Sequence, residues 1–412
     1  MKFGKPAQVA LIASAALATA TLFTACQQYT STLTVDFLYV TSNQQVPGEI
    51  QVYEVNSQSG VLRPIPTSPF PSGGRNPVAE AVAPNHLNLY VVNEDDNDIV
   101  QMGIGTDGKL YPQNTINTAG SFPISLAINT QGNYLYTADT YSPIPSCSST
   151  NPCSGDLAVY PVDSTGKPGS PLFNSTASPT YWPLQLSPTD SKTILTPTSV
   201  NVLANGKYVY VTAYHPTSSV PTTNPSGYPV SSQGYLFAFE VNSDGTLTQM
   251  NNGIPITSGQ LPSAMASDAN SQYLYVADYK LGQITTYSVQ NGMPMAVTTT
   301  PSGSLPLSLS LDTYGNLYAA NAGDSTLKMY ATSSNGTLSL SGTYAVGTYP
   351  VAVLPDPHGL GFIYTANFLG NTMSGFQISK NSGALVNTQN SPYPSMVQPT
   401  AIVGVPHNGS IH

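Results

Sequence analysis

The chain has 412 residues, carries a formal net charge of −9 at neutral pH, and has charged side chains at only 8% of its positions. An acidic chain with 11 basic residues repels phosphate backbones, so this composition argues against nucleic acid as a partner. Its 34 glycines, 36 prolines and 26 tyrosines, with no sustained helical periodicity after the N-terminal segment, predict a turn-rich all-β protein.

Residues 1–25 are typical of a secretory signal peptide. Lys2 and Lys5 give a positive start, and an apolar run rich in alanine and leucine follows over residues 7–23. The core of this run is too short for a membrane-spanning helix, which favours a signal that is cleaved from the mature protein.

The cysteine that ends this segment predicts a lipid anchor. Residues 22–26, Leu-Phe-Thr-Ala-Cys, resemble a bacterial lipobox, in which the signal is cleaved before a cysteine that becomes lipidated. An ordinary signal peptide followed by a chance cysteine is the alternative. If Cys26 is lipidated, residues 26–35 are expected to form a tether between the lipid and the folded domain. The protein would then contact the membrane only through the lipid. The residue after the anchor cysteine is Gln27 and not aspartate. By analogy with lipoprotein sorting, this favours the outer membrane of a bacterial envelope.

Internal repetition predicts the fold. A strand-like unit of aromatic and β-branched residues recurs seven times, with a tyrosine at Tyr39, Tyr90, Tyr136, Tyr210, Tyr275, Tyr318 and Tyr364. An alternating strand and a turn with a short strand follow each unit. A further strand precedes every tyrosine strand but the first, and a last one ends the repeat; these strands begin at Pro77, Pro123, Pro197, Pro262, Pro306, Pro350 and Pro399, each with a small residue two positions later. Four strands per repeat, with small residues where the innermost strands crowd together, predict a seven-bladed β-propeller.

The order of strands at the two ends predicts how the ring closes. The chain enters the repeat with a tyrosine strand at Tyr39 and leaves it with a proline-led strand over residues 399–405. These two halves complete one blade and remove the free edges of the ring. We therefore expect residues 36–406 to form one monomeric propeller, with residues 407–412 as a tail.

The segment NPVAEAVAPNHLNLYVVNE, residues 76–94, resembles the repeat of the seven-bladed β-propeller lactonase family, known for its Tyr-Val-Thr-Asn signature. The resemblance extends over residues 36–406. It implies the propeller fold and, because the family includes 6-phosphogluconolactonases, the hydrolysis of a sugar lactone. An Arg-His pair after a proline is typical of those enzymes and is missing from all seven repeats. No catalytic residue of the family is therefore transferred to this chain.

Glu80 is the one charged residue at a position that is apolar in the other six repeats. A buried carboxylate needs a partner or a shifted pKa, which makes Glu80 a candidate general base. Arg75 lies five residues earlier and is the candidate stabiliser of a developing oxyanion. The alternative is a structural ion pair near the axis.

Four carboxylates cluster in the turn after the second tyrosine strand. Glu94, Asp95, Asp96 and Asp98 could hold a calcium ion through hard oxygen ligands, or they could form a solvated acidic turn. We expect no other cofactor.

The remaining cysteines, Cys147 and Cys153, lie in a loop rich in proline, serine and asparagine. An even pair outside the cytoplasm predicts a disulfide. A metal site is the poorer alternative, because no histidine or further cysteine lies nearby.

Three insertions, over residues 139–155, 167–195 and 214–234, are predicted to share one face of the third and fourth blades. The middle one is interpreted as the connection between these blades. The loops carry six candidate binding residues, namely Tyr141, Tyr181, Trp182, Tyr214, His215 and Tyr228. Aromatic loops with few charges favour a protein or carbohydrate partner, whereas packing of these rings against each other is the alternative.

Two functions follow from these observations. The first is an envelope-tethered module that binds a ligand or protein through loops of the third and fourth blades. The alternative is a lactonase-type hydrolase acting on a sugar or related lactone. No Gly-x-Ser-x-Gly or His-Glu-x-x-His motif occurs to favour another hydrolase chemistry.

Overall fold

The computed structural model describes residues 34–43, 47–174, 179–190, 192–217 and 231–407. The predicted signal peptide, Cys26, most of the tether and Tyr228 lie outside these residues. In the described part of the chain, no helix is long and apolar enough to cross a membrane.

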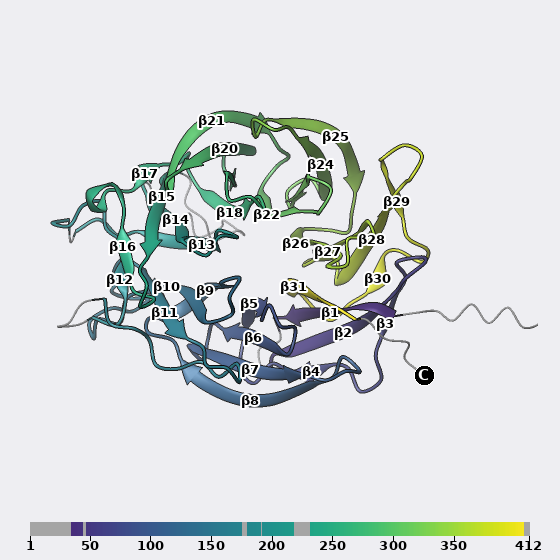
Figure 1. Ribbon diagram of the computed structural model, residues 1–412, viewed down its shortest axis with the longest axis horizontal. Helices are drawn as coiled ribbons and strands as arrows, with labels where there is room; N and C mark the ends of the chain where they lie inside the picture. Colours follow the sequence, from purple (N-terminus) through teal and green to yellow (C-terminus); the bar gives the residue numbers. More distant parts are fainter. Residues whose placement is uncertain (1–33, 44–46, 175–178, 191, 218–230, 408–412) are drawn as a thin grey trace, which may run out of the picture.

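Seven antiparallel sheets surround a common axis (Figure 1). The innermost strands are β5 (Pro77–Val82), β9 (Ser121–Ile128), β13 (Thr196–Val202), β18 (Pro262–Ser267), β22 (Pro306–Leu311), β26 (Pro350–Pro355) and β31 (Pro399–Pro406). The second strands, which carry the repeated tyrosines, are β1 (Thr34–Ser42), β6 (Asn88–Asn93), β10 (Tyr134–Tyr141), β14 (Tyr208–Pro216), β19 (Tyr273–Asp278), β23 (Asn316–Asn321) and β27 (Phe362–Asn367).

The outer half of each blade is more variable. The third strands are β2 (Glu49–Asn56), β7 (Asp98–Ile104), β11 (Asp156–Pro161), β15 (Ser232–Val241), β20 (Gln283–Gln290), β24 (Thr326–Thr332) and β28 (Thr372–Ile378). The outer strands are β3 (Leu62–Pro64) with β4 (Phe70–Pro71), β8 (Leu110–Asn117), β12 (Trp182–Pro183), β16 (Leu247–Gln249) with β17 (Ile256–Thr257), β21 (Met293–Pro301), β25 (Leu338–Ala345), and β29 (Leu385–Asn387) with β30 (Tyr393–Pro394). The predicted seven-bladed propeller is confirmed.

The first blade is built from both ends of the chain, as the sequence predicts. β31 pairs with β1 along its length, with Ile402 opposite Val40 and Ala401 opposite Thr41. This pairing closes the ring and covers the inner edge of β1 (Figure 1).

Hydroxyl groups link neighbouring inner strands around the axis. Thr400 donates to the Pro77 carbonyl at 2.7 Å, Thr198 to that of Pro262 at 2.7 Å, and Ser263 to that of Pro306 at 2.6 Å. Ser125 and Ser308 instead accept from the backbone N–H groups of Val200 and Val353, both at 3.1 Å. The small residues near the axis therefore join blades as well as making room for them.

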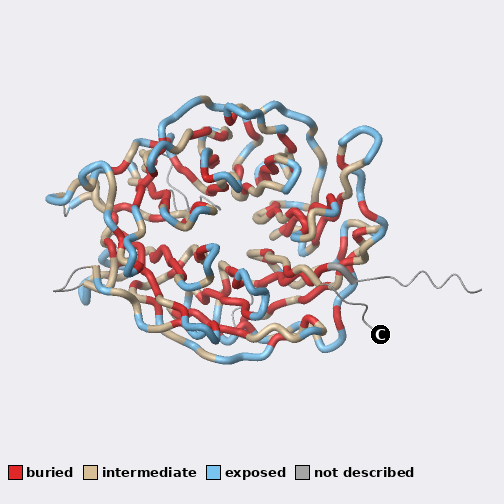
Figure 2. Tube along the Cα trace, viewed as in Figure 1, coloured by how far each residue is buried: buried red, intermediate tan, exposed pale blue. Residues whose placement is uncertain are grey.

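The repeated tyrosines have a similar role further out. Their side chains are buried, and Figure 2 shows the middle strands of the ring as largely buried and outer strands such as β8 and β21 as mostly exposed. Four of the tyrosines donate to a glycine carbonyl in the hairpin of the next blade. These bonds are Tyr39 to Gly108 (3.1 Å), Tyr90 to Gly166 (2.7 Å), Tyr210 to Gly292 (2.8 Å) and Tyr364 to Gly60 (2.8 Å). We call this contact the tyrosine latch. At these four positions the hydrogen bond explains why the residue is a tyrosine, which the composition alone does not.

The prediction for residues 167–195 is wrong in one respect. This segment is not a single connection between blades, because β12 lies within it and pairs with β11 as the outer strand of the third blade. Leu172 already bonds to Val159 at 2.8 Å, so the insertion interrupts the outer strand. The described residues 184–190 and 192–195 belong to the connection to the fourth blade.

Candidate functional site

Two sets of residues lie together on one face of the propeller, around its axis. Successive antiparallel strands reverse direction, so the residue before each inner strand and the residue at the end of each second strand lie on the same face. In five blades a backbone bond joins them, such as Glu94 N–H to Asn76 O at 2.9 Å and Tyr279 N–H to Leu261 O at 2.8 Å. In blade order the pairs are Gln398 with Asn43, Asn76 with Glu94, Phe122 with Tyr141, Thr196 with Tyr214, Leu261 with Tyr279, Leu305 with Ala322, and Tyr349 with Phe368. We call this ring of pairs the rim.

The rim holds strained backbone. Five residues that precede the prolines have φ between 53° and 59°, namely Asn76, Phe122, Leu305, Tyr349 and Gln398. The left-handed region is unfavourable for residues with a β-carbon, especially bulky ones such as phenylalanine, leucine and tyrosine. Such strain is often found at functional sites, which directs attention to the rim.

Most of the rim is apolar. Phe122 and Tyr141 pack edge to face with ring centroids 5.8 Å apart, and Tyr349 and Phe368 are 6.3 Å apart. Tyr214, Leu261 and Tyr279 form a buried cluster between them. Burial and the neighbouring Tyr279 hydroxyl both raise the pKa of Tyr349, so this hydroxyl stays protonated.

The second blade supplies a polar sector, which we define as Arg75, Asn76, Glu94, Asp95 and Asp96. The Asn76 side chain donates to Glu94 Oε2 at 2.7 Å. Arg75 forms an ion pair with Asp96, with Nη2 2.6 Å and Nε 2.7 Å from Oδ1, and its backbone N–H donates to Oδ2 at 2.7 Å.

The pKa values of two carboxylates in this sector, Glu94 and Asp96, are shifted in opposite directions. Burial, reinforced by the Asp95 charge, raises the pKa of Glu94, and the Asn76 hydrogen bond offsets this only in part. The hydrogen bond from Arg75 lowers the pKa of Asp96. A carboxylate of raised pKa that is held by an amide is suited to general acid–base chemistry, and the same sector also holds the Arg75 guanidinium.

The structure does not form the predicted pair of Glu80 and Arg75. Glu80 lies in the inter-blade layer against the first blade, and both of its carboxylate oxygens are buried without a hydrogen bond of normal geometry. Burial raises its pKa well above the ordinary value, opposed in part by the backbone of Val403 and Thr41. Arg75 instead lies at the exposed surface with Asp96. The reason is the strand alternation, which turns Glu80 toward the neighbouring blade.

The predicted calcium site has no support in this geometry. Its carboxylates have separate partners, since Glu94 binds Asn76, Asp96 binds Arg75, and Asp98 accepts from Asn93 at 2.7 Å. Across the described residues, no three His, Cys, Asp or Glu side chains are arranged to hold a metal.

The aromatic residues of the third and fourth blades are mostly packed inward. Trp182 is 4% exposed and donates through Nε1 to the Leu247 carbonyl at 2.8 Å, within the core between these blades. Tyr214 is buried in the rim, and His215 Nδ1 lies 2.9 Å from the Ile194 carbonyl. Tyr181 is partly buried. For Trp182 and Tyr214 the structure favours the packing alternative over an exposed binding surface.

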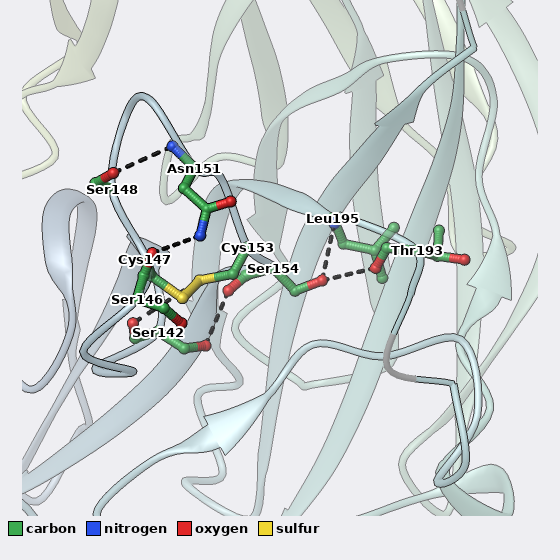
Figure 3. Close-up of a disulfide and its surroundings, with 9 residues drawn as sticks. All are labelled: Ser142, Ser146, Cys147, Ser148, Asn151, Cys153, Ser154, Thr193 and Leu195. Atoms are coloured by element: carbon green, nitrogen blue, oxygen red, sulfur yellow. Dashed lines mark hydrogen bonds between the residues drawn. A yellow bond between two sulfur atoms is a disulfide. The ribbon is translucent and has the colours of Figure 1, made fainter.

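The disulfide between Cys147 and Cys153 is present (Figure 3). It closes the tip of the third-blade insertion, where the Asn151 side chain donates to the Ser146 carbonyl at 2.7 Å. At the base, Ser154 Oγ donates to the Thr193 carbonyl at 2.8 Å (Figure 3). The loop is therefore attached to the connection that leads into the fourth blade.

Sequence reasoning missed Asn76 and assigned Glu94 to a metal site. A signal was available in the register of the repeat. The residues that precede the seven prolines are amides only in the first two blades, at Gln398 and Asn76, and Glu94 is the only acid among the residues that end the second strands at the rim. Comparing rim positions rather than inner-strand positions would have identified this polar sector.

Comparisons with known proteins agree with the architecture. The model of a family described as lactonase, seven-bladed β-propeller, matches residues 37–180 and 184–306. A periplasmic gluconolactonase of Pseudomonas aeruginosa, PpgL, is similar in structure, with 20% identity, a TM-score of 0.69, and coverage of 90% of this chain and 99% of that chain. A candidate 6-phosphogluconolactonase of Bacteroides fragilis has 17% identity, a TM-score of 0.70, and coverage of 92% and 100%. A search of curated proteins finds no match.

Proposed function

Because this chain belongs to the lactonase family of seven-bladed β-propellers, we propose that it hydrolyses a lactone at the polar sector of the rim. The observation that supports this site is the raised pKa of Glu94, which lies 2.7 Å from the Asn76 amide and in the same sector as the Arg75 guanidinium. No other sector of the rim combines a carboxylate, an amide and a guanidinium within the described residues.

The proposed chemistry needs one base and one source of positive charge. Glu94 accepts a proton from water as the water oxygen bonds to the lactone carbonyl carbon. Arg75 stabilises the negative charge that develops on the carbonyl oxygen. The ring C–O bond then breaks, the proton passes to the departing ring oxygen, and the product is a hydroxy acid.

The charge of the sector supports an unphosphorylated substrate. Arg75 is its only cation and is already paired with Asp96, while Glu94 and Asp95 add further negative charge. A phosphate dianion needs an available guanidinium or ammonium group to offset its desolvation. We therefore propose a neutral sugar lactone or a related neutral lactone.

We further propose that the protein acts in the bacterial cell envelope, attached by a lipid at Cys26. The lipobox-like residues 22–26 and the disulfide between Cys147 and Cys153 support this location. The binding-module alternative has less support, since Trp182 and Tyr214 are buried.

The experiment is a pH-stat assay of the purified protein with glucono-1,5-lactone, its 6-phosphate and an aromatic lactone. We expect hydrolysis of the unphosphorylated sugar lactone and a loss of about 100-fold in kcat/KM for Glu94→Gln. Asp163→Asn is the matched control, because Asp163 is exposed in an outer hairpin and should leave the rate unchanged. Equal or absent rates in wild type and Glu94→Gln would remove this function and favour the binding module.

A further inference from the structure

Six of the seven junctions between blades share the same glycine contact, and one junction lacks it. At six junctions, the glycine of the outer hairpin packs directly on the residue two positions before the repeated tyrosine of the preceding blade. A β-carbon added to the glycine would lie 2.2 to 2.5 Å from that side chain. The pairs are Gly108 on Phe37, Gly166 on Asn88, Gly245 on Tyr134, Gly292 on Tyr208, Gly336 on Tyr273 and Gly60 on Phe362.

The junction between the sixth and seventh blades departs from this rule. Its hairpin glycine, Gly383, has no neighbouring atom within 4 Å of an added β-carbon. The position that holds an aromatic ring at five other junctions is Asn316, whose amide donates to Asp312 Oδ2 at 2.8 Å. Tyr318 also donates to this oxygen at 2.8 Å and so forms no tyrosine latch with the hairpin.

A cavity of about 530 Å³ occupies the space that the contact would have filled. Met329 and Ile378 contribute apolar surface, and the ring of Tyr314, which is 63% exposed, lies at its edge. The hairpin between β28 and β29, which contributes residues to its lining, projects from the ring (Figure 1). The volume is within the range of natural sites for small ligands.

We propose that this cavity, which we call the junction pocket, binds a hexose ring that carries a carboxylate. A pyranose has the size of the missing aromatic ring and one apolar face that packs against the ring of a tyrosine such as Tyr314. Ser341, Ser379 and Ser382 also line the pocket and supply hydroxyl partners for a sugar.

The charge of the junction pocket selects an acidic sugar. Lys380 lines it, and no aspartate or glutamate does, although the protein as a whole is acidic. A carboxylate on the ligand would form a charge-assisted hydrogen bond with this ammonium group. The product of a sugar lactonase is also a sugar acid, but it is an open-chain hydroxy acid without the pyranose ring, and the junction pocket does not depend on that activity.

The junction pocket and the rim lie on opposite faces of the propeller. The pocket is formed by the turn after β22, the turn after β26 and the hairpin after β28, whereas the rim follows the second strands. The two sites can therefore be tested separately.

The test is calorimetric titration with glucuronate and with methyl glucoside. We expect glucuronate to bind about tenfold more tightly than methyl glucoside, and Lys380→Ala to remove this difference. Asn316→Tyr restores the ring that Tyr208 and Tyr273 provide elsewhere, so it should abolish binding while keeping the melting temperature and any lactonase rate. Leu340→Ala, an exposed position on β25 outside the lining, should bind as wild type does.

Two results would overturn the proposal. Undiminished glucuronate binding by a folded Asn316→Tyr protein would place the ligand elsewhere. Equal affinity for the two sugars in the wild type would refute selection by Lys380. Neither readout involves lactone hydrolysis. A negative binding result would therefore not affect the proposed function, and a negative hydrolase assay would not affect the proposal for the junction pocket.

Discussion

Asp139 and Asp156 face each other at the first rung of the pairing between β10 and β11, and both side chains are fully buried. The Asp139 Oδ2 atom accepts from Gly120 N–H at 2.9 Å, whereas its Oδ1 atom and both oxygens of Asp156 have no other donor within normal hydrogen-bond geometry. Two buried carboxylates on directly opposed residues cannot both ionise without strong repulsion, so the pair is stable when it shares a proton.

Burial is the main cause of the shifted acidity of this pair. It raises the pKa of Asp139 from 3.8 to about 7, and the pKa of Asp156 well above its ordinary value with help from the Asp139 charge. Between pH 4 and 7 the folded protein holds a proton that the unfolded chain releases. The free energy of unfolding therefore falls as the pH rises through this range.

Asparagine in place of Asp139 should remove this penalty. The second blade already has this arrangement, because Asn93 occupies the same position and donates to Asp98 Oδ1 at 2.7 Å. We expect Asp139→Asn to raise the free energy of unfolding by about 1–3 kcal/mol at pH 8, and to have little effect at pH 5. Denaturant unfolding at both pH values measures this difference.

Asn93→Asp provides the matched control, since it creates a second buried carboxylate pair and should introduce a pH-dependent loss of stability in the second blade. Identical pH dependence in wild type and Asp139→Asn, or destabilisation of Asp139→Asn at pH 8, would refute the shared-proton account.

Further predictions concern the ring and its insertion. Tyr364→Phe removes the donor to the buried Gly60 carbonyl and should lower the free energy of unfolding by about 1–2 kcal/mol, measured by urea denaturation. Cys147→Ser opens a short loop at the surface and should destabilise it locally by about 2 kcal/mol. Faster proteolysis within residues 142–155, with an unchanged unfolding transition of the ring, is the expected result. Deleting residues 399–412 removes β31 and exposes β1 as an edge, so aggregation is expected on size-exclusion chromatography.

The fold could be predicted because its information is local and repeated. In six blades a proline lies 12 to 14 residues before the tyrosine, all seven prolines have a small residue two positions later, and the repetition makes the register clear. Ring closure followed from the order of strands at the two ends of the chain. The tyrosine latch was not predicted, because it joins residues such as Tyr39 and Gly108 that are 69 positions apart.

The candidate site was harder to predict because it depends on side-chain direction. Glu80 and Arg75 are five residues apart in the sequence, yet one points between blades and the other lies at the surface. Trp182 was expected in an exposed loop, but it belongs to an outer strand whose partner, β11, ends more than 20 residues earlier. Asn76 and Glu94 are 18 residues apart and meet only once the second blade is folded.

The pH dependence of kcat/KM for an unphosphorylated sugar lactone tests the central proposal most directly. If Glu94 is the base, the rate should rise with pH through a pKa above that of an ordinary glutamate. Asp95→Asn should shift this rise to lower pH, because the Asp95 charge contributes to the raised pKa of Glu94. Glu94→Gln should abolish the rise and most of the rate. A profile that is the same in all three proteins would contradict catalysis at the polar sector.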